Sequence, residues 1–187
     1  MTNPVLVSEA YAFAAERHTE QRRKGEKEEP YINHLVEVAA LVAAATEGKD
    51  PSLIAAAVLH DTLEDTNTTW SELESAFGRD VADLVSEVTD DKSLPKQTRK
   101  DLQVRNTPGK SSRARIIKIA DKISNLRSLL KSPPGNWSQE RKAIYLAWAR
   151  EVVAGASGVN AWLEDVFDEA ARELEAELHN GSSANSS

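Results

Sequence analysis

Residues 53–66 read LIAAAVLHDTLEDT, an apolar run that passes directly into a run of ionisable side chains. Burying an ionisable group costs several kcal/mol unless the group is paired, hydrogen-bonded or bound to a metal. If one helix continues through this stretch, His60 and Glu64 share a face because they lie four residues apart, and so do Asp61 and Asp65. The stretch therefore predicts a buried helix whose end carries a divalent-metal site, with spare carboxylates beside it.

Apolar residues elsewhere recur at spacings of three and four, the period of an amphipathic helix. The clearest rows are Ile32, Leu35, Val36, Ala39, Val42 and Ala43; Ile116, Ile119, Ala120, Ile123, Leu126 and Leu130; and Val159, Trp162, Leu163, Val166, Phe167, Ala170 and Leu174. No segment shows convincing β alternation. We therefore predict an all-α fold, a compact multi-helix bundle of about eight or nine helices.

Helix boundaries are indicated by capping and breaking residues. Asp50 before Pro51 is typical of a helix start, and Ser71 with Glu74 predicts a capping box. Helix ends are expected at Gly48, at Gly78 and at residues 133–135, and loops over residues 22–30, 91–97, 105–111 and 131–137. One domain is expected over residues 1–179, followed by a flexible polar tail over residues 180–187.

Composition narrows the class of protein. The 187 residues suit one domain with a single core, and 40% hydrophobic with 28% charged residues is ordinary for a soluble globular protein. No apolar run approaches the roughly 20 residues that span a bilayer, and no signal-peptide pattern is visible. The absence of cysteine excludes disulfides, thiolate catalysis and zinc–thiolate sites. A cytoplasmic location without membrane partners is therefore expected.

The net charge of −7 argues against broad binding to nucleic acid, which normally needs a basic face. It leaves room for a small anionic substrate, because a local basic cluster and a metal can hold a phosphate group on an acidic protein. The oligomeric state stays open.

Four metal-competent side chains stand within or beside apolar helical segments: His34, His60, Asp61 and Asp121. Two imidazoles and two carboxylates form a mixed nitrogen and oxygen set that suits Mn²⁺, Fe²⁺, Co²⁺ or Zn²⁺ rather than Ca²⁺. His18, in a charged segment, and His179, near the polar tail, are expected at the surface.

Each of the four also has an ordinary interpretation. His34 alone fits a hydrogen-bonded core histidine, Asp121 alone fits the buried partner of a cation on its own helix, and His60 with Asp61 fits a helix-end pair. Each of these interpretations needs its own explanation, whereas one bound metal explains all four residues. We therefore favour the metal site.

Five motifs together resemble one known family: QRRK at 21–24, PYINH at 30–34, LHDTLEDT at 59–66, VTDDK at 88–92 and KIADKISNL at 118–126. Separate His, His-Asp and Asp elements are the pattern of the HD-domain metal-dependent phosphohydrolases. The wider set is similar to the hydrolase domain of the RelA/SpoT family, in particular to the stand-alone small alarmone hydrolases that include the metazoan SpoT homologue. The resemblance runs from about residue 7 to about residue 178.

The resemblance implies hydrolysis of the 3′-pyrophosphate of guanosine tetra- or pentaphosphate (ppGpp or pppGpp), giving GDP or GTP and pyrophosphate, with one Mn²⁺ ion. Glu64 and Asp65 then become the catalytic carboxylates, which orient or deprotonate water or protonate the leaving 3′-oxygen. Which of the two does which stays open. The substrate contacts that it implies are Arg23, Lys24, Lys96, Asn125, Arg141 and Tyr145.

Ordinary interpretations of the substrate contacts also stay open. A basic run such as Arg22, Arg23 and Lys24 is usually a solvated loop. Tyr145 fits core packing, and Asn125 fits a helix-surface amide. The acidic loop at residues 25–29 is unexpected beside a polyphosphate site.

Alternative functions differ in class. An HD phosphohydrolase acting on another phosphorylated nucleotide, such as NADPH, would use the same ligands. A binding module without turnover would not need Glu64 and Asp65. A purely structural helical protein would have to bury the four candidate ligands without a metal.

Overall fold

The structure is a computed structural model that describes the backbone of residues 4–184 and the side chains of residues 4–180. Within those residues the chain forms ten α-helices and one 3₁₀ helix: α1 (Pro4–Arg17), α2 (Ile32–Ala45), α3 (Pro51–Leu59), α4 (Thr62–Asp65), α5 (Trp70–Phe77), α6 (Arg79–Val88), α7 (Lys96–Asn106), η1 (Thr107–Gly109), α8 (Ser112–Lys131), α9 (Gln139–Ala156) and α10 (Ala161–Ala184). They contain no β-strand, only an isolated antiparallel bridge between Arg22 and Pro30. The predicted all-α class is confirmed.

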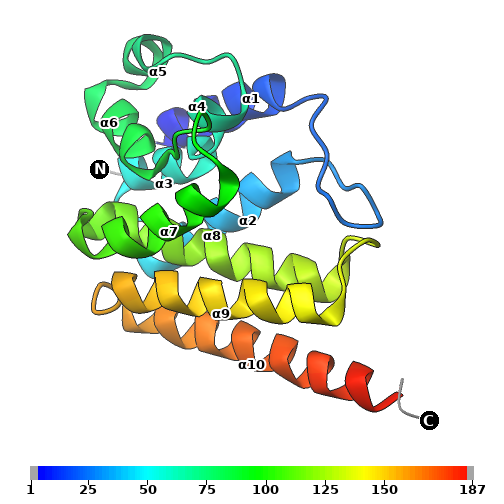
Figure 1. Ribbon diagram of the computed structural model, residues 1–187. Coiled ribbons are helices and arrows are strands. Elements are labelled where there is room, and N and C mark those ends of the chain that lie inside the picture. The colour runs from blue at the N-terminus through cyan, green and yellow to red at the C-terminus, as the bar shows by residue number, and fades with distance from the viewer. Residues whose placement is uncertain (1–3, 185–187) are drawn as a thin grey trace.

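Helix α8 connects two layers of helices. Figure 1 shows α8, α9 and α10 running side by side, with α1, α3, α5 and α6 gathered above them. Helix α8 contacts α9 and α10 on one side and α2 and α6 on the other, whereas α3 packs among α1, α2 and α6. The two layers therefore meet where α2, α3 and α8 come together. None of the described helices is long and apolar enough to cross a membrane.

Helix α3 is buried from Leu53 to Leu59. The helix has apolar side chains on all of its faces, and three consecutive alanines let neighbouring helices approach closely. Its start is the predicted one, because the Asp50 side chain accepts a hydrogen bond from the Leu53 N–H and Pro51 occupies the first turn. Helical backbone angles continue through the next two residues into α4, so the buried helix delivers its polar end into the interior.

Several predicted boundaries change in the structure. The capping box at the start of α5 is formed by Thr69 and Glu72 rather than by Ser71 and Glu74, because the helix begins two residues earlier than expected. The loop predicted over residues 105–111 is largely helical, since α7 reaches Asn106 and η1 follows it. The tail expected from residue 180 begins inside α10, which continues to Ala184, and its last residues, 185–187, lie outside the described chain.

The predicted helix ends at the glycines and prolines are confirmed. Gly48 (φ 66°) follows α2, and its N–H bonds back to Ala43 O at 2.8 Å. Gly78 (φ 82°) ends α5, and α8 ends at Lys131, before the proline pair. Glycine adopts positive φ without the steric cost that a side chain brings.

Two loops are held against each other beside the layer junction. Gly25 is buried so closely against the backbone after α8 that an added Cβ would lie 2.1 Å from Ser132 O. The Glu26 N–H donates to Pro133 O at 3.2 Å, and the Lys27 N–H donates to Ser132 Oγ at 3.1 Å. This contact fixes the segment that carries the basic run of residues 22–24.

Candidate metal centre and substrate cleft

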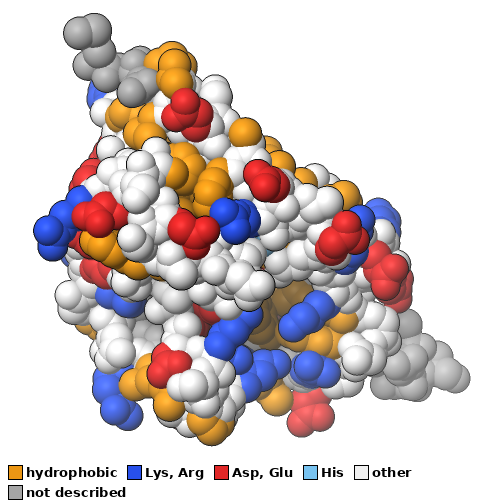
Figure 2. Space-filling view, turned by 90° about the horizontal axis from the view of Figure 1, so that it is seen from above, with side chains coloured by type: hydrophobic (Ala, Val, Ile, Leu, Met, Phe, Trp, Pro, Cys, Tyr) orange, Lys and Arg blue, Asp and Glu red, His pale blue; other side chains and the backbone are white. Residues whose placement is uncertain are grey.

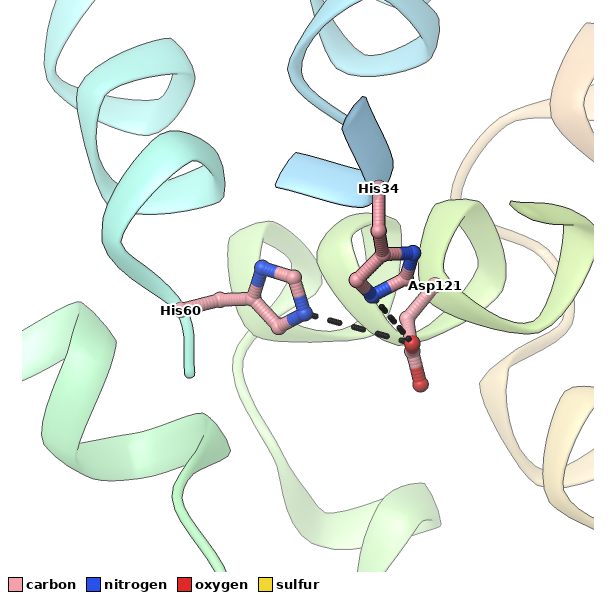
Figure 3. A group of neighbouring side chains, drawn as sticks. All are labelled: His34, His60 and Asp121. Atoms are coloured by element: carbon pink, nitrogen blue, oxygen red, sulfur yellow. Dashed lines mark ion pairs between the residues drawn. The ribbon is translucent and has the colours of Figure 1, made fainter. Parts of the chain in front are cut away.

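Three of the predicted ligands come together from three separate segments of the chain. His34 of α2, His60 after α3 and Asp121 of α8 place one ligand atom each within 4.8 Å of one another (Figure 3). Asp121 Oδ1 lies 3.3 Å from His34 Nε2 and 3.9 Å from His60 Nε2. Asp61 joins them, since its Oδ2 lies 3.1 Å from His60 Nε2 and 3.6 Å from His34 Nε2. The four predicted ligands therefore lie close together, with both carboxylates beside the two histidine nitrogens.

A chain of polar side chains orients His34. Its Nδ1 lies 2.9 Å from Ser124 Oγ, and Ser124 donates its own proton to Glu37 Oε2 at 2.7 Å. Arg127 donates to the other oxygen of Glu37 at 3.2 Å. Because the Ser124 proton is already used, Nδ1 of His34 must be the donor, which leaves Nε2 with a free lone pair in the neutral ring.

His60 is oriented in the same sense. Its Nδ1 lies 2.9 Å from the carbonyl oxygen of Ala57, which can only accept, so Nδ1 carries the proton. Nε2 is buried and has no hydrogen-bond partner among the described residues. A buried Nε2 that faces two carboxylates and a second histidine nitrogen fits a divalent cation, which binds there once Nε2 has given up any proton of its own.

The electrostatics of the four groups agree with that fit. Burial raises the pKa of Asp61, but His60 outweighs it and holds that pKa well below its usual range. Burial also raises the pKa of Asp121, but the charge of Lys122 and the contacts with the histidines lower it more. The pKa of Asp121 therefore lies well below its usual range. The pKa of His34 is lowered, first by burial. For His60 burial lowers the pKa, whereas Asp61 and Asp121 raise it to about 9 overall. Two ionised carboxylates thus attract a cation, which would displace the proton of His60.

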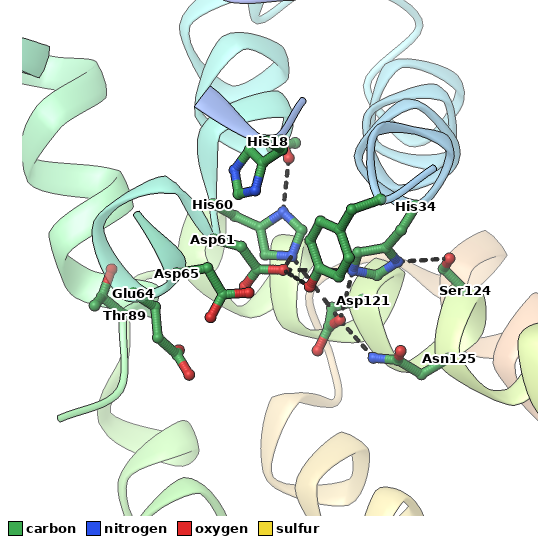
Figure 4. A network of polar contacts seen from close by, with 12 residues as sticks. His18, His34, His60, Asp61, Glu64, Asp65, Thr89, Asp121, Ser124 and Asn125 are labelled. Carbon is green, nitrogen blue, oxygen red and sulfur yellow. Dashed lines mark hydrogen bonds and ion pairs between the residues drawn. The ribbon is translucent and has the colours of Figure 1, made fainter. Parts of the chain in front are cut away.

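Neighbouring donors hold both carboxylate ligands. The Tyr31 hydroxyl donates to Asp61 Oδ2 at 2.6 Å, and burial followed by the Asp61 charge raises the pKa of Tyr31, so the hydroxyl keeps its proton. Lys122 Nζ donates to Asp121 Oδ2 at 2.8 Å, and Asn125 Nδ2 donates to Asp121 Oδ1 at 2.6 Å. Figure 4 shows the contact of Asn125 with Asp121 beside the two histidines. Tyr31 and Lys122 had no role in the sequence-based prediction, although both lie inside the quoted motifs.

Asp65 lies one helical turn beyond Asp61 and is held by two side chains. Gln21 Nε2 donates to Asp65 Oδ2 at 2.7 Å, and Lys92 Nζ forms an ion pair with the other oxygen. In the view of Figure 4, Asp65 and Glu64 follow Asp61 on the side opposite His34. Asp65 is therefore beside the metal ligands but bound to partners of its own.

Glu64 is placed differently. Its carboxylate accepts from the Asp90 N–H at 3.3 Å and from Arg99 Nη1 at 3.3 Å. Burial raises the pKa of Glu64, and the charges of Asp61 and Asp90 raise it further. A carboxylate whose pKa is raised beside a metal site is suited to carrying a proton.

Two connected hollows open around these side chains. The inner chamber, of about 290 Å³, contains the four ligands and Glu64, together with the cations Arg99, Lys118 and Lys122. The outer groove, of about 810 Å³, is lined by Asp65, Arg22, Arg23, Arg141, Trp137 and Ile144 among others. Six residues line both: Lys24, Tyr31, Lys96, Lys100, Asn125 and Tyr145. Figure 2 shows Lys and Arg side chains gathered around a hollow with an apolar floor.

All six predicted substrate contacts line this cleft. Lys24, Lys96, Asn125 and Tyr145 lie where the hollows join, and Arg23 and Arg141 line the outer groove. Arg23 Nη2 also donates to Asn125 Oδ1 at 3.1 Å. The Arg141 guanidinium lies 4.5 Å from the centre of the Trp137 ring, a residue that the prediction left without a role.

The expectation that His18 lies at the surface is wrong. Its relative exposure is 2%, and its ring stacks on Tyr31. The signal was present in the sequence, because Ala10, Ala14 and His18 continue one buried row at a spacing of four residues. His179 is exposed, as expected, although it belongs to α10 rather than to a tail.

A family model described as HD domain matches residues 10–151. A Xenopus tropicalis protein named guanosine-3′,5′-bis(diphosphate) 3′-pyrophosphohydrolase MESH1 is 47% identical over 167 residues, which cover 89% of this chain and 93% of the relative. The human protein of the same name is 48% identical over 159 residues, covering 85% and 89%.

A solved structure, described as a metazoan ortholog of SpoT that hydrolyses ppGpp, superposes with a TM-score of 0.88. It is 43% identical in sequence, and the match covers 92% of this chain and 97% of that one. The fold, the ligand geometry and these similarities agree: this chain belongs to the HD-domain family and, within it, to the group of relatives named MESH1.

Proposed function

We propose that this protein hydrolyses the 3′-pyrophosphate of guanosine tetra- or pentaphosphate, releasing GDP or GTP and pyrophosphate. One observation carries the proposal: two histidine nitrogens and two carboxylates lie together where a cation-lined cleft narrows, with Glu64 and Asp65 beside them. The names of the MESH1 relatives support the same reaction and substrate. The predicted cytoplasmic location is part of this proposal.

The proposed cofactor is one Mn²⁺ ion held by His34, His60, Asp61 and Asp121. A nitrogen and oxygen ligand set suits Mn²⁺, although other first-row metals fit the same donors. When bound, the metal supplies a Lewis acid that withdraws charge from a phosphoryl oxygen and makes water more acidic.

The two hollows suggest how the substrate lies. Trp137, Tyr145 and Ile144 offer the outer groove apolar surface for a nucleoside, and aromatic rings stack well on bases. Arg23 and Arg141 can bind phosphate oxygens there through their planar guanidinium groups. The 3′-pyrophosphate then points into the inner chamber, toward the ligands.

The cations of the inner chamber suit that pyrophosphate. Burial lowers the pKa of Lys118, and the neighbouring Lys122 lowers it further. The pKa of Lys100 is lowered first by burial and then by Lys96 and Lys122. A polyanion relieves this repulsion between like charges, so it binds favourably among them.

The proton transfer is assigned to Glu64. Its carboxylate takes a proton from the attacking water as the new bond to phosphorus forms. The bond from phosphorus to the 3′-oxygen breaks, and that oxygen takes a proton from solvent in the open groove. Asp65, at the groove side, orients the reacting groups through its remaining lone pairs.

The test is product analysis by anion-exchange chromatography. Purified protein, stripped of metal and given Mn²⁺, is incubated with guanosine tetraphosphate. GDP and pyrophosphate should appear only with metal and should be absent with Asp121→Asn. Parallel reactions with Mg²⁺, Fe²⁺ and Zn²⁺ test the choice of metal. An unchanged tetraphosphate together with release of phosphate from NADPH would overturn the proposed substrate in favour of the alternative.

A further inference from the structure

The turn after α1 carries polar side chains that the proposed reaction does not use directly. His18 is buried at the end of the Ala10 and Ala14 row. Its ring stacks on Tyr31, with centroids 5.4 Å apart and planes inclined by 25°. Tyr31 in turn meets the edge of the His34 ring at 5.5 Å. A contiguous set of rings therefore connects His18 with the metal centre.

Two hydrogen-bonded arms extend from this pair of rings to the carboxylates of α4 and its cap. In the first, His18 Nδ1 lies 2.6 Å from Gln21 Oε1, and the Gln21 amide nitrogen donates to Asp65 Oδ2 at 2.7 Å. In the second, the Tyr31 hydroxyl donates to Asp61 Oδ2 at 2.6 Å. The arms end on carboxylates one helical turn apart, joined by the bond from the Asp65 N–H to Asp61 O at 2.8 Å.

The first arm has a defined direction. Gln21 Oε1 can only accept, so His18 Nδ1 must carry a proton. Asp65 fixes which end of the Gln21 amide faces it, because the reversed amide would set its oxygen against a carboxylate, and the amide oxygen then accepts from His18 Nδ1. Lys92 also contacts Asp65, but its side chain is 48% exposed and long, so it adds charge without fixing a direction.

Packing alone does not account for a histidine at position 18. Its Nε2 is buried without a hydrogen-bond partner among the described residues, an arrangement that costs stability. An apolar side chain of similar size would fill the same space without that cost. The polar contact that His18 does make holds the oxygen of the Gln21 amide, whose nitrogen reaches Asp65.

We propose that His18, Gln21 and Tyr31 are positioning residues that hold the Asp61 and Asp65 carboxylates at a fixed separation. The inference rests on the proposed function, in which Asp61 is a ligand and Asp65 orients the reacting groups. Two ionised carboxylates on one helical turn repel each other, and a neutral amide and a phenol hold them without changing the charge of the site. The reaction slows when a catalytic group is present but is not held in the productive geometry.

The experiment compares variants that keep the packing and remove one contact. His18→Phe keeps a ring against Tyr31 and removes the Nδ1 donor, whereas His18→Asn restores a donor near the position of Nδ1. Gln21→Leu removes the contact to Asp65. Glu20→Ala, at an exposed neighbouring position, is the matched control. Turnover of guanosine tetraphosphate, Mn²⁺ affinity and melting temperature are measured for each.

We expect His18→Phe and Gln21→Leu to lower kcat by about 10- to 100-fold, the size seen when supporting residues of a site are removed. KM, Mn²⁺ affinity and melting temperature should stay close to wild type, and His18→Asn should recover part of kcat. Wild-type kcat in both packing-preserving variants would overturn the proposal. So would a loss of kcat that only follows a loss of folded protein.

A readout independent of turnover separates this proposal from the proposed function. Nitrogen NMR of the protein loaded with diamagnetic Zn²⁺, which does not broaden signals as Mn²⁺ does, reports which nitrogen of His18 carries the proton. The Nδ1-protonated form is expected in wild type, and its signal should change in Gln21→Leu but not in Glu20→Ala. If wild-type protein shows this signal but does not hydrolyse guanosine tetraphosphate, the proposed reaction is wrong. The hydrogen bonds from His18 through Gln21 to Asp65 are then still supported. A signal from the Nε2-protonated form overturns the arm.

Discussion

At the residue scale, each candidate histidine presents one nitrogen to the metal centre because a partner holds the other. For His34 that partner is Ser124, whose hydroxyl is in turn bonded to Glu37. For His60 it is the Ala57 carbonyl, which belongs to the backbone of α3. The first contact can be removed by mutation, whereas the second cannot.

We therefore expect Ser124→Ala to weaken Mn²⁺ binding by about 10- to 100-fold, because the His34 ring loses the acceptor that fixes its orientation. Isothermal titration calorimetry of the metal-stripped protein measures this. Ser128→Ala, one turn further along α8, is the matched control and should bind Mn²⁺ as wild type does. Unchanged affinity in Ser124→Ala would contradict the role of the Ser124 contact.

Glu64 allows a prediction with opposite effects on rate and stability. Its pKa is raised by burial and then by Asp61 and Asp90, so the ionised form is less favourable in the fold than in the unfolded chain. The penalty is present above the raised pKa and disappears as pH falls below the unfolded value of 4.5. Glu64→Gln should therefore raise the melting temperature of the metal-stripped protein at neutral pH, with the gain vanishing in acid.

The same variant should lower kcat by about 100-fold or more, because a glutamine takes no proton. In wild type the rate should rise with pH through the raised pKa of Glu64, and this limb of the pH profile should be missing in the residual activity of Glu64→Gln. Retention of the limb would assign it to another group.

At the element scale, α3 joins the stability of the fold to the geometry of the centre. Its polar end carries His60 and Asp61, and its N-terminus is capped by Asp50. Asp50 also pairs with Arg113 of α8, which in addition contacts Asp80. The cap is thus remote from the ligands and can be tested without touching them.

Asp50→Ala should lower the free energy of unfolding by about 0.5–2 kcal/mol, since the Leu53 N–H loses its acceptor. At roughly 2–4 °C per kcal/mol for a chain of this size, the melting temperature should fall by a few degrees. Asp80→Ala removes only an exposed partner of Arg113 and should cost less. Equal losses in both variants, by chemical denaturation, would show that the Arg113 pairs rather than the cap carry the effect.

At the scale of the whole molecule, an acidic chain carries a basic cleft. The net charge is −7, yet lysines and arginines of α7, α8, α9 and the loop after α1 line both hollows. The pKa of Lys96 is lowered first by burial and then by Arg141 and Lys24, so these cations repel one another. The cleft therefore attracts a polyanion over short distances, while the rest of the surface repels it.

KM for guanosine tetraphosphate should accordingly rise about 3- to 10-fold between low salt and roughly 0.5 M salt, as screening shortens the reach of these charges. Lys96→Ala should raise KM at low salt and flatten its salt dependence. Lys49→Ala removes an exposed lysine that pairs with Glu47 between α2 and α3, outside the cleft, and should behave as wild type. A KM independent of salt would contradict electrostatic capture.

The helical class and the candidate ligand residues were readable in the sequence because both depend on local pattern. Helical periodicity requires only neighbouring residues, and His60 and Asp61 attract notice because they end a wholly apolar run. Partners that meet from distant parts of the chain left no such pattern. Tyr31 lies 30 positions from Asp61, and Ser124 lies 90 positions from His34. Packing of α2, α3 and α8 brings them together. The packing of α1 on α3 and α2 buries His18, where the charged neighbours in sequence outweighed the row that His18 shares with Ala10 and Ala14.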